Sequence, residues 1–304
     1  MSASTSVSGA ATGSLSRRER QAKPTTRVRQ VGVRLRANPV SMFGLVLAIA
    51  LIGVAIAAPI IAPYDPVTLD PRNRLLPPSA MNWFGTDDGG RDILSRVLFG
   101  ARYSLLAAAV VLLLAVTVGT AVGLVAGFAG GKIDEALMRL TDMFLAFPAL
   151  VLAMGISAAL GASLANSMIA IAVVWWPWYA RLVRGQTLRL RQEQFIDAAR
   201  ASGAGDAHMI LRHILPNCWT PIIVQVSLDV GYAILTTASL SFIGLGAQPP
   251  TPEWGAMVSI GKDYILNQWW MATFPGLAIF LTVMAFNLLG DGLQEALSPI
   301  LRRR

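Results

Sequence analysis

Six apolar stretches, each about long enough to cross a lipid bilayer, restrict the fold of this chain more than any other feature of its sequence. They occupy residues 40–62, 103–128, 134–160, 166–183, 218–240 and 269–289. About 20 residues at roughly 1.5 Å rise per residue cover the roughly 30 Å hydrocarbon core of a membrane. The sequence therefore predicts an all-α, polytopic membrane protein with six transmembrane helices.

Composition agrees with this class and argues against a nucleic-acid-binding domain. Hydrophobic residues make up 54% of the chain and charged residues only 14%, which is too apolar for a soluble domain of 304 residues. The net charge of +8 comes largely from arginines near the two ends, a pattern typical of cytoplasmic flanks in membrane proteins. We expect membrane lipid around the chain and no nucleic acid partner.

The distribution of arginine also predicts the topology. Residues 1–38 are rich in Ser, Thr, Ala and Arg and are expected to form a disordered, basic cytoplasmic tail. The fourth span ends in an aromatic cluster at 175–179 followed by Arg181 and Arg184, which is typical of a cytoplasmic exit. Six crossings return the C-terminus to the side of the N-terminus, so both termini and the loop after the fourth span are expected in the cytoplasm.

That loop, 193–216, is the main polar interruption among the later spans and is predicted to form two short helices. Residues 195–202 favour a helix that Gly203 and Gly205 end, Asp206 is positioned to cap the next helix, and Pro216 is expected to stop it. Ala198 and Ala199 offer a smooth patch for close backbone approach. The expected apolar anchors for a partner's groove are Phe195, Met209, Ile210 and Ile214.

The same loop resembles the "EAA" cytoplasmic loop of bacterial ATP-binding-cassette (ABC) importer permeases. The resemblance rests on Asp197-Ala198-Ala199, on Gly203 four residues later, and on the closing Leu215-Pro216. Asp197 stands where the family has Glu, and His213 stands where it usually has Ile. The resemblance implies that the residues coupling the chain to an ATPase are Phe195, Asp197, Ala198, Ala199, Gly203, Asp206, Leu215 and Pro216. By itself the motif fits any surface helical hairpin about equally well.

A second motif supplies the context. The run 82–105 contains FGTDDGGRDILSRVLFGAR, which resembles a signature of permeases from the dipeptide, oligopeptide and nickel importer group. It lies in the loop 64–101, expected outside the cytoplasm, where 93–99 is predicted to form a short interfacial helix capped by Thr86 or Asp87. Nearby acids lack the ligand spacing of a calcium loop, so local pairing with Arg91 and Arg96 is expected instead.

Together these resemblances imply the permease fold of an ABC type I importer and a division of the chain. Residues 39–63 would be an N-terminal transmembrane helix, and 102–304 the core permease domain with the coupling loop at 190–216. The implied partners are a paralogous second permease, two ABC ATPase subunits and an extracytoplasmic solute-binding protein, all at a bacterial inner membrane. The implied cargo is a dipeptide or oligopeptide, with nickel or glutathione as alternatives.

Catalytic and metal chemistry are not expected in this chain. The run Gly131-Lys132 lacks the remaining residues of a phosphate-binding loop, so ATP hydrolysis is assigned to partner chains. With one cysteine, and with His208 and His213 off the i,i+4 spacing, the sequence predicts no metal site and no cofactor.

Asp229 remains open as a possible pore-lining residue. An ionised carboxylate near the middle of a span costs roughly 2.5–3.5 kcal/mol on insertion scales, so Asp229 should face a wet cavity or a partner helix. A functional and a packing role are about equally expected. A self-sufficient secondary carrier, with Asp229 as its titrating group, is the alternative from another class of protein.

Three packing features complete the predictions. Gly119, Gly123 and Gly127 form a small-residue stripe for close helix packing in lipid. Pro148 is expected to kink the third span. Arg139 and Asp142 are expected to pair at the entry of that span.

Overall fold

The computed structural model describes residues 38–297 as a bundle of helices. The long elements are α3 (Pro39–Ile61), α4 (Ile93–Ala129), α5 (Gly131–Leu145), α6 (Ala149–Leu160), α7 (Leu164–Arg191), α10 (Leu215–Phe242) and α12 (Trp270–Leu297). Shorter ones are α8 (Gln194–Ala201), α9 (Asp206–His208), α11 (Trp254–Gly261) and the turns η2 (Pro71–Asn73), η3 (Met209–Ile214) and η4 (Lys262–Tyr264). Within 38–297 no β-strand forms beyond an isolated bridge between Thr86 and Asp92. The all-α prediction is confirmed.

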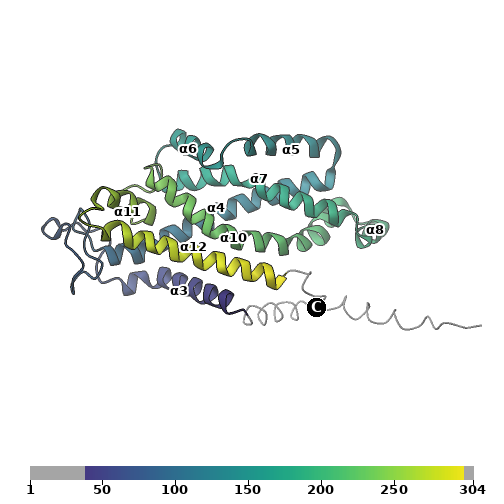
Figure 1. Ribbon diagram of the computed structural model, residues 1–304. Coiled ribbons are helices and arrows are strands. Elements are labelled where there is room, and N and C mark those ends of the chain that lie inside the picture. The colour runs from purple at the N-terminus through teal and green to yellow at the C-terminus, as the bar shows by residue number, and fades with distance from the viewer. Residues whose placement is uncertain (1–37, 298–304) are drawn as a thin grey trace, which may run out of the picture.

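The long helices run along the bundle, with α12 packed between α3 and α10 and with α4 packed against α7 (Figure 1). The segment between α3 and α4 gathers with α11 at one end of the bundle, and α8 lies at the other (Figure 1). Both ends of the described chain lie at the α8 end, where Asn38 Nδ2 donates a hydrogen bond of 3.0 Å to Glu295 Oε2. The predicted tail falls outside the described residues except for Asn38, whose side chain caps α3.

By length and composition, four helical segments are apolar enough to cross a membrane: α3, α4, residues 206–242 and α12. The pair α5 and α6 makes a fifth span if the two bent helices are counted together. The helix at the predicted fourth span, α7, is 28 residues long but is not among them. The count of six crossings therefore stays a prediction.

The third predicted span is not a continuous kinked helix. Helices α5 and α6 are bent by 88° at the break between Leu145 and Ala149. Pro148 is the residue before α6, with φ −57° and ψ 121°, and it cannot continue the hydrogen bonding of α5 because it has no N–H. The predicted Arg139–Asp142 pair is also wrong, since Arg139 bonds to Glu135 and Asp142 to Arg181, each at 2.5 Å.

The short interfacial helix expected at 93–99 is the beginning of α4, which continues unbroken for 37 residues. The residue that caps α4 is Asp92, and not Thr86 or Asp87 as predicted. Asp92 Oδ2 accepts hydrogen bonds of 2.7 Å from the Ser95 backbone N–H and from the Ser95 hydroxyl. No proline lies between residues 93 and 129 to end the helix after its first turns. The predicted local pairing is confirmed: Asp87 lies 2.7 Å from Arg91 and 3.4 Å from Arg96.

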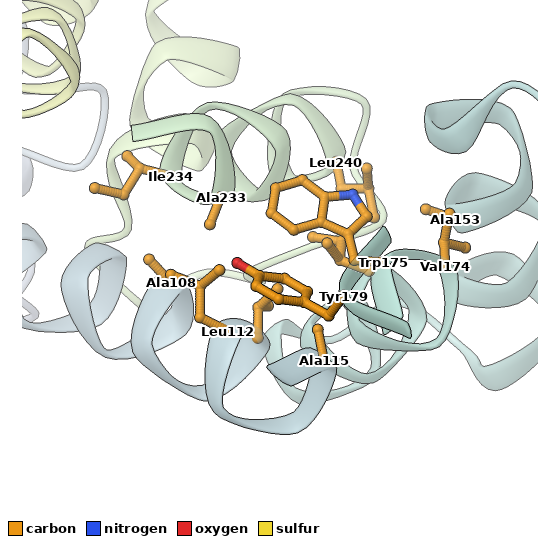
Figure 2. Packing of buried hydrophobic residues seen from close by; sticks show 12 residues of the cluster. Ala108, Leu112, Ala115, Ala153, Val174, Trp175, Tyr179, Ala233, Ile234 and Leu240 are labelled. Carbon is orange, nitrogen blue, oxygen red and sulfur yellow. The ribbon is translucent and has the colours of Figure 1, made fainter. Parts of the chain in front are cut away.

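The glycine stripe of α4 packs on α7 as predicted. A Cβ atom placed at Gly119 would lie 2.5 Å from the Trp176 carbonyl oxygen, and one at Gly123 would lie 2.5 Å from that of Ala180. Only glycine permits this approach. On the N-terminal side of the stripe along α4, a buried apolar cluster joins α4, α6, α7 and α10. Tyr179 of α7 lies between α4 and α10 in this cluster (Figure 2).

Candidate functional site

The loop at the α8 end begins with the helix that the sequence predicted. Helix α8 ends where Gly203 adopts φ +82°, a left-handed conformation that costs other residues about 1–2 kcal/mol. The Gly203 N–H donates to the Arg200 carbonyl at 3.0 Å, and the Ala204 N–H donates to that of Ala199 at 3.1 Å. Gly203 therefore ends the helix as expected, whereas Gly205 has an ordinary φ of −73°.

The second half of the loop differs from the prediction. Asp206 makes no cap, because it is already the first residue of α9 and the residue before it, Gly205, has no side chain. Pro216 does not stop a helix; it lies in the first turn of α10, where proline's missing N–H is tolerated. The chain passes from α9 through the π-helical turn η3 directly into α10.

Two of the predicted anchors face the protein interior and not a partner. Met209 and Ile214 are 1% and 0% exposed, and they pack with Ile196 of α8 in a cluster that also contains residues of α4, α7 and α10. Ile196 is fully buried but is not among the apolar anchors predicted from the sequence of this loop. These three side chains fix α8 to the bundle.

An open groove of about 640 Å³ lies between α8 and the π-helical turn. It brings together four of the predicted site residues, Phe195, Ala198, Ala199 and Gly203. The other lining residues are Ser202, Ala204, Gly205, His208 and His213. Four other predicted site residues, Asp197, Asp206, Leu215 and Pro216, do not line it. Asp197 is exposed beside the groove and lies 3.8 Å from Arg200.

His208 and His213 both line the groove because the turn between them is π-helical. Their ring centres are 5.6 Å apart, and that of Phe195 lies 6.4 Å from that of His213. In the sequence their spacing is off the i,i+4 spacing of an α-helix, but a π-helix has more residues per turn, which brings positions five apart onto one side. No set of three or more metal-ligating side chains occurs within the described part of the chain.

A second cavity, of about 650 Å³, lies at the predicted fifth span between α7 and α10. Asp229 lines it, with Tyr179 Oη donating to Oδ2 at 2.6 Å and Gln225 Nε2 donating to Oδ1 at 3.0 Å. In Figure 2 the Tyr179 hydroxyl points to the α10 side of the apolar cluster. Asp229 was expected to face a cavity or to pair with a neighbouring helix, and the structure has both, because Asp229 lines the cavity and is bonded by Tyr179 of α7. Sequence reasoning missed Tyr179, since it lies 50 residues from Asp229.

An all-helical bundle with apolar spans, a groove at one end and a mostly apolar cavity that contains a carboxylate is compatible with a membrane permease subunit. Residues 119–303 match the family model "Binding-protein-dependent transport system inner membrane component", which covers more than half of the chain. Residues 26–78 match the model "N-terminal TM domain of oligopeptide transport permease C". The chain belongs to the family of binding-protein-dependent transport permeases.

Individual relatives agree with the family. A probable D,D-dipeptide transport system permease protein of Escherichia coli (strain K12) is 49% identical over 265 residues, 87% of this chain and 89% of that one. A dipeptide transport system permease protein of Alkalihalophilus pseudofirmus is 46% identical over 271 residues, 89% of each chain. A glutathione transport system permease protein of Escherichia coli O6:K15:H31 is 48% identical over 267 residues, 88% of each chain.

A solved structure shares the fold. A chain of the MetNI methionine ABC transporter, in an inward-facing conformation, superposes with a TM-score of 0.55 at 18% identity. The match covers 68% of this chain and 98% of that chain. It confirms the predicted ABC-importer permease fold.

Proposed function

We propose that this chain is the permease subunit of an ABC importer and that the groove lined by Phe195, Ala198, Ala199 and Gly203 receives an ATPase subunit. The observation that carries the proposal is the groove itself. Small side chains form its floor, so a partner helix or loop can approach the backbone closely. Buried Ile196 packs α8 against the helices of the bundle, so a displacement of α8 by a partner is passed directly to those helices.

The proposed assembly contains a paralogous second permease, two ABC ATPase subunits and an extracytoplasmic solute-binding protein. This chain would form half of the pore and hydrolyse no ATP itself. Family membership supports the binding-protein partner, because the matched family is described as binding-protein-dependent. The paralogous permease follows from the resemblance, in which two related chains share one pore.

The proposed cargo is a small peptide. The three relatives are named for the transport of a D,D-dipeptide, a dipeptide and glutathione, all of which are peptides. Between these, dipeptide and oligopeptide cargo is the primary proposal, and glutathione is the alternative within the same architecture. Nickel is the alternative implied only by the wider group.

We place the α8 end of the bundle in the cytoplasm of a bacterium and the opposite end, with α11, outside the inner membrane. Arginines at 181, 184, 189 and 191 lie along the part of α7 that leads to α8, as expected for a cytoplasmic flank. Residue 38 and residue 297 lie at this same end (Figure 1). Both termini are therefore proposed to be cytoplasmic.

The proposed mechanism is alternating access. Closure of the ATPases on nucleotide displaces α8, and the Ile196 cluster carries the displacement into α7 and α10, which enclose the cavity. A secondary carrier would need no such groove and would purify without ATPase chains. Affinity purification of this chain from its native membrane distinguishes the two classes, since ATPase subunits should accompany it.

Two tryptophan substitutions on α8 test the groove. Ala198→Trp places an indole inside it, whereas Ala201→Trp places one on an exposed position of the same helix outside it. We expect Ala198→Trp to abolish co-purification of the ATPases and peptide uptake in proteoliposomes, with Ala201→Trp close to wild type. Retained ATPases and uptake in Ala198→Trp would rule out the groove as the docking surface.

Gly203 provides an independent test of the turn. Gly203→Val strains a backbone at φ +82° and should uncouple uptake from ATP hydrolysis. Gly205→Ala is the matched control, because φ is −73° there and no atom lies within 4 Å of the added Cβ. Unchanged uptake in Gly203→Val would contradict a coupling role.

A further inference from the structure

The cavity between α7 and α10 has the dimensions and lining of a small-molecule site. Its volume of about 650 Å³ lies within the roughly 300–1,000 Å³ of ligand pockets. Its lining is mostly apolar and aromatic, with polar groups from Asp229, Gln225, Tyr179 and Arg181. Asp229 and Tyr179 lie near the middles of α10 and α7, so the site is at membrane depth.

Among the residues that the structure describes, the Asp229 carboxylate has hydrogen-bond donors but no counter-ion. Each of its carboxylate oxygens accepts one hydrogen bond, from Tyr179 or from Gln225, although a carboxylate offers about four lone-pair positions. Throughout residues 38–297, no Arg, Lys or His side chain lies within 4.0 Å of this carboxylate. Acidic side chains at membrane depth face the bundle interior or a water-filled cavity, and the remaining lone pairs of Asp229 can accept hydrogen bonds from a cationic ligand there.

Aromatic rings border this carboxylate. Trp175 stacks on Tyr232 with ring centres 5.1 Å apart and an interplanar angle of 15°. Tyr232 and Trp178 both line the cavity and are 57% and 61% exposed, although Trp175 covers one face of Tyr232. A carboxylate among aromatic faces is the chemistry that recognises an ammonium group. A metal cation is disfavoured because the described residues that line this cavity include one carboxylate and no histidine or cysteine.

Arg181 supplies the opposite charge at the edge of the same cavity. It bonds to Asp142 through Nη2 at 2.5 Å, and its side chain is 49% exposed. A guanidinium has five N–H donors, so others remain for a carboxylate. The cavity therefore offers an anionic and a cationic group to one ligand.

We propose that this cavity is a transit site for zwitterionic cargo, in which Asp229 binds the free α-ammonium group and Arg181 attracts the carboxylate. The inference rests on the proposed function, because that function supplies a peptide to the cavity. Tyr179 and Gln225 are positioning residues that hold the Asp229 carboxylate toward the cavity. The recognised feature is the charged amino terminus of a peptide, independent of its side chains.

The test compares Ala-Ala with N-acetyl-Ala-Ala, which lacks the ammonium charge. Binding of each peptide to the purified permease–ATPase complex is measured by quenching of tryptophan fluorescence, without the binding protein, so that its own selectivity does not contribute. We expect wild type to prefer Ala-Ala by at least about tenfold, the range for a hydrogen bond to a charged group. Asp229→Asn, which keeps the size of the side chain, should remove this preference and leave N-acetyl-Ala-Ala binding unchanged.

Asp263→Asn is the matched control, because it removes an exposed carboxylate outside the cavity and should leave the preference intact. Equal weakening of both peptides by Asp229→Asn, an unchanged preference, or no preference in wild type would each overturn the proposal. Loss of the second permease from the Asp229→Asn complex would also overturn it, since the counter-ion would then belong to that chain. The proposed function is tested by a separate measurement: it would be wrong if ATPase chains were absent from the wild-type preparation, whatever the peptide preference.

Discussion

Substituting Gly123 tests whether the contact between α4 and α7 requires glycine. An alanine Cβ at this position would lie 2.5 Å from the Ala180 carbonyl oxygen, 2.8 Å from Val183 Cβ and 2.9 Å from the Arg184 backbone nitrogen. Two of these atoms are backbone, so no side-chain rotation relieves the contact. Opening the shortest distance from 2.5 Å to the 3.4 Å at which ordinary contact begins requires the helices to separate locally by about 0.9 Å.

The expected cost follows from this separation. Overpacking of a close-packed interior typically costs about 1–3 kcal/mol. Gly119 and Gly127 make similarly close contacts with α7, so separation at Gly123 also loosens contacts one turn away on either side. Against this, alanine gains about 1 kcal/mol of helix propensity over glycine. Gly185→Ala isolates that gain, because Gly185 is an exposed residue of α7 with no atom within 4 Å of an added Cβ.

The assay is thermal unfolding of the purified complex, followed by fluorescence-detected size-exclusion chromatography. We expect Gly123→Ala to be less stable than Gly185→Ala by about 2 kcal/mol, which corresponds to roughly 4–8 °C in Tm for a domain of this size. Uptake should fall in parallel, since α7 leads directly into α8. Equal Tm values for the two variants would refute the argument that the glycine stripe sets the distance between these helices.

Three further predictions concern the end of the bundle opposite α8. Asp92→Ala removes the cap of α4 and should cost about 0.5–2 kcal/mol in thermal unfolding, with Asp92→Asn closer to wild type. Arg96 Nη1 donates hydrogen bonds to the carbonyls of residues 66 and 250 at 2.7 and 3.3 Å, so its side chain joins two loops. Arg96→Lys should therefore increase proteolysis of the 62–92 loop, and unchanged cleavage would contradict this role of Arg96. Burial raises the pKa of Glu253 above its ordinary 4.5, despite hydrogen bonds that lower it. The protonated side chain is therefore favoured in the folded state. This contribution to the free energy of unfolding is full below pH 4.5 and is lost as the pH rises through the folded-state pKa. The Tm of Glu253→Gln minus that of wild type should therefore increase with pH, and a constant difference would contradict this.

Sequence reasoning succeeded where a local pattern determines the structure. Hydropathy located the helices because an apolar run of about 20 residues matches the thickness of the hydrocarbon core and, as a helix, forms the hydrogen bonds of its own backbone. Gly203 was recognised as a helix terminator because few other residues adopt φ +82° without strain. The glycine stripe was recognised because small residues every four positions lie on one face of a helix.

It failed where the outcome depends on geometry that the sequence does not encode locally. Pro148 predicts an interruption, but the 88° turn also requires α5 to leave the axis of α6, and nothing near Pro148 specifies that angle. His208 and His213 meet because a π-helical turn replaces an α-helical one, and the sequence has no simple signal for that change. Tyr179 reaches Asp229 only after α7 packs beside α10.

The connection between the groove and the cavity is short and structural. Helix α7 carries Tyr179, which bonds to Asp229, and its next turn carries Arg184, which holds Asp134 of α5 through two hydrogen bonds of 2.5 and 2.6 Å. The same helix ends at Arg191, three residues before α8 begins, and η3 on the far side of the groove continues without a break into α10. A displacement of the groove relative to the bundle therefore moves the ends of both helices that enclose the cavity. Because the Tyr179–Asp229 bond joins those two helices at membrane depth, a change in their relative position alters the carboxylate's surroundings. The proposed docking surface thus lies at one end of the helix pair α7 and α10, and the proposed transit site lies near the middle of the same pair, so packed helices connect the two.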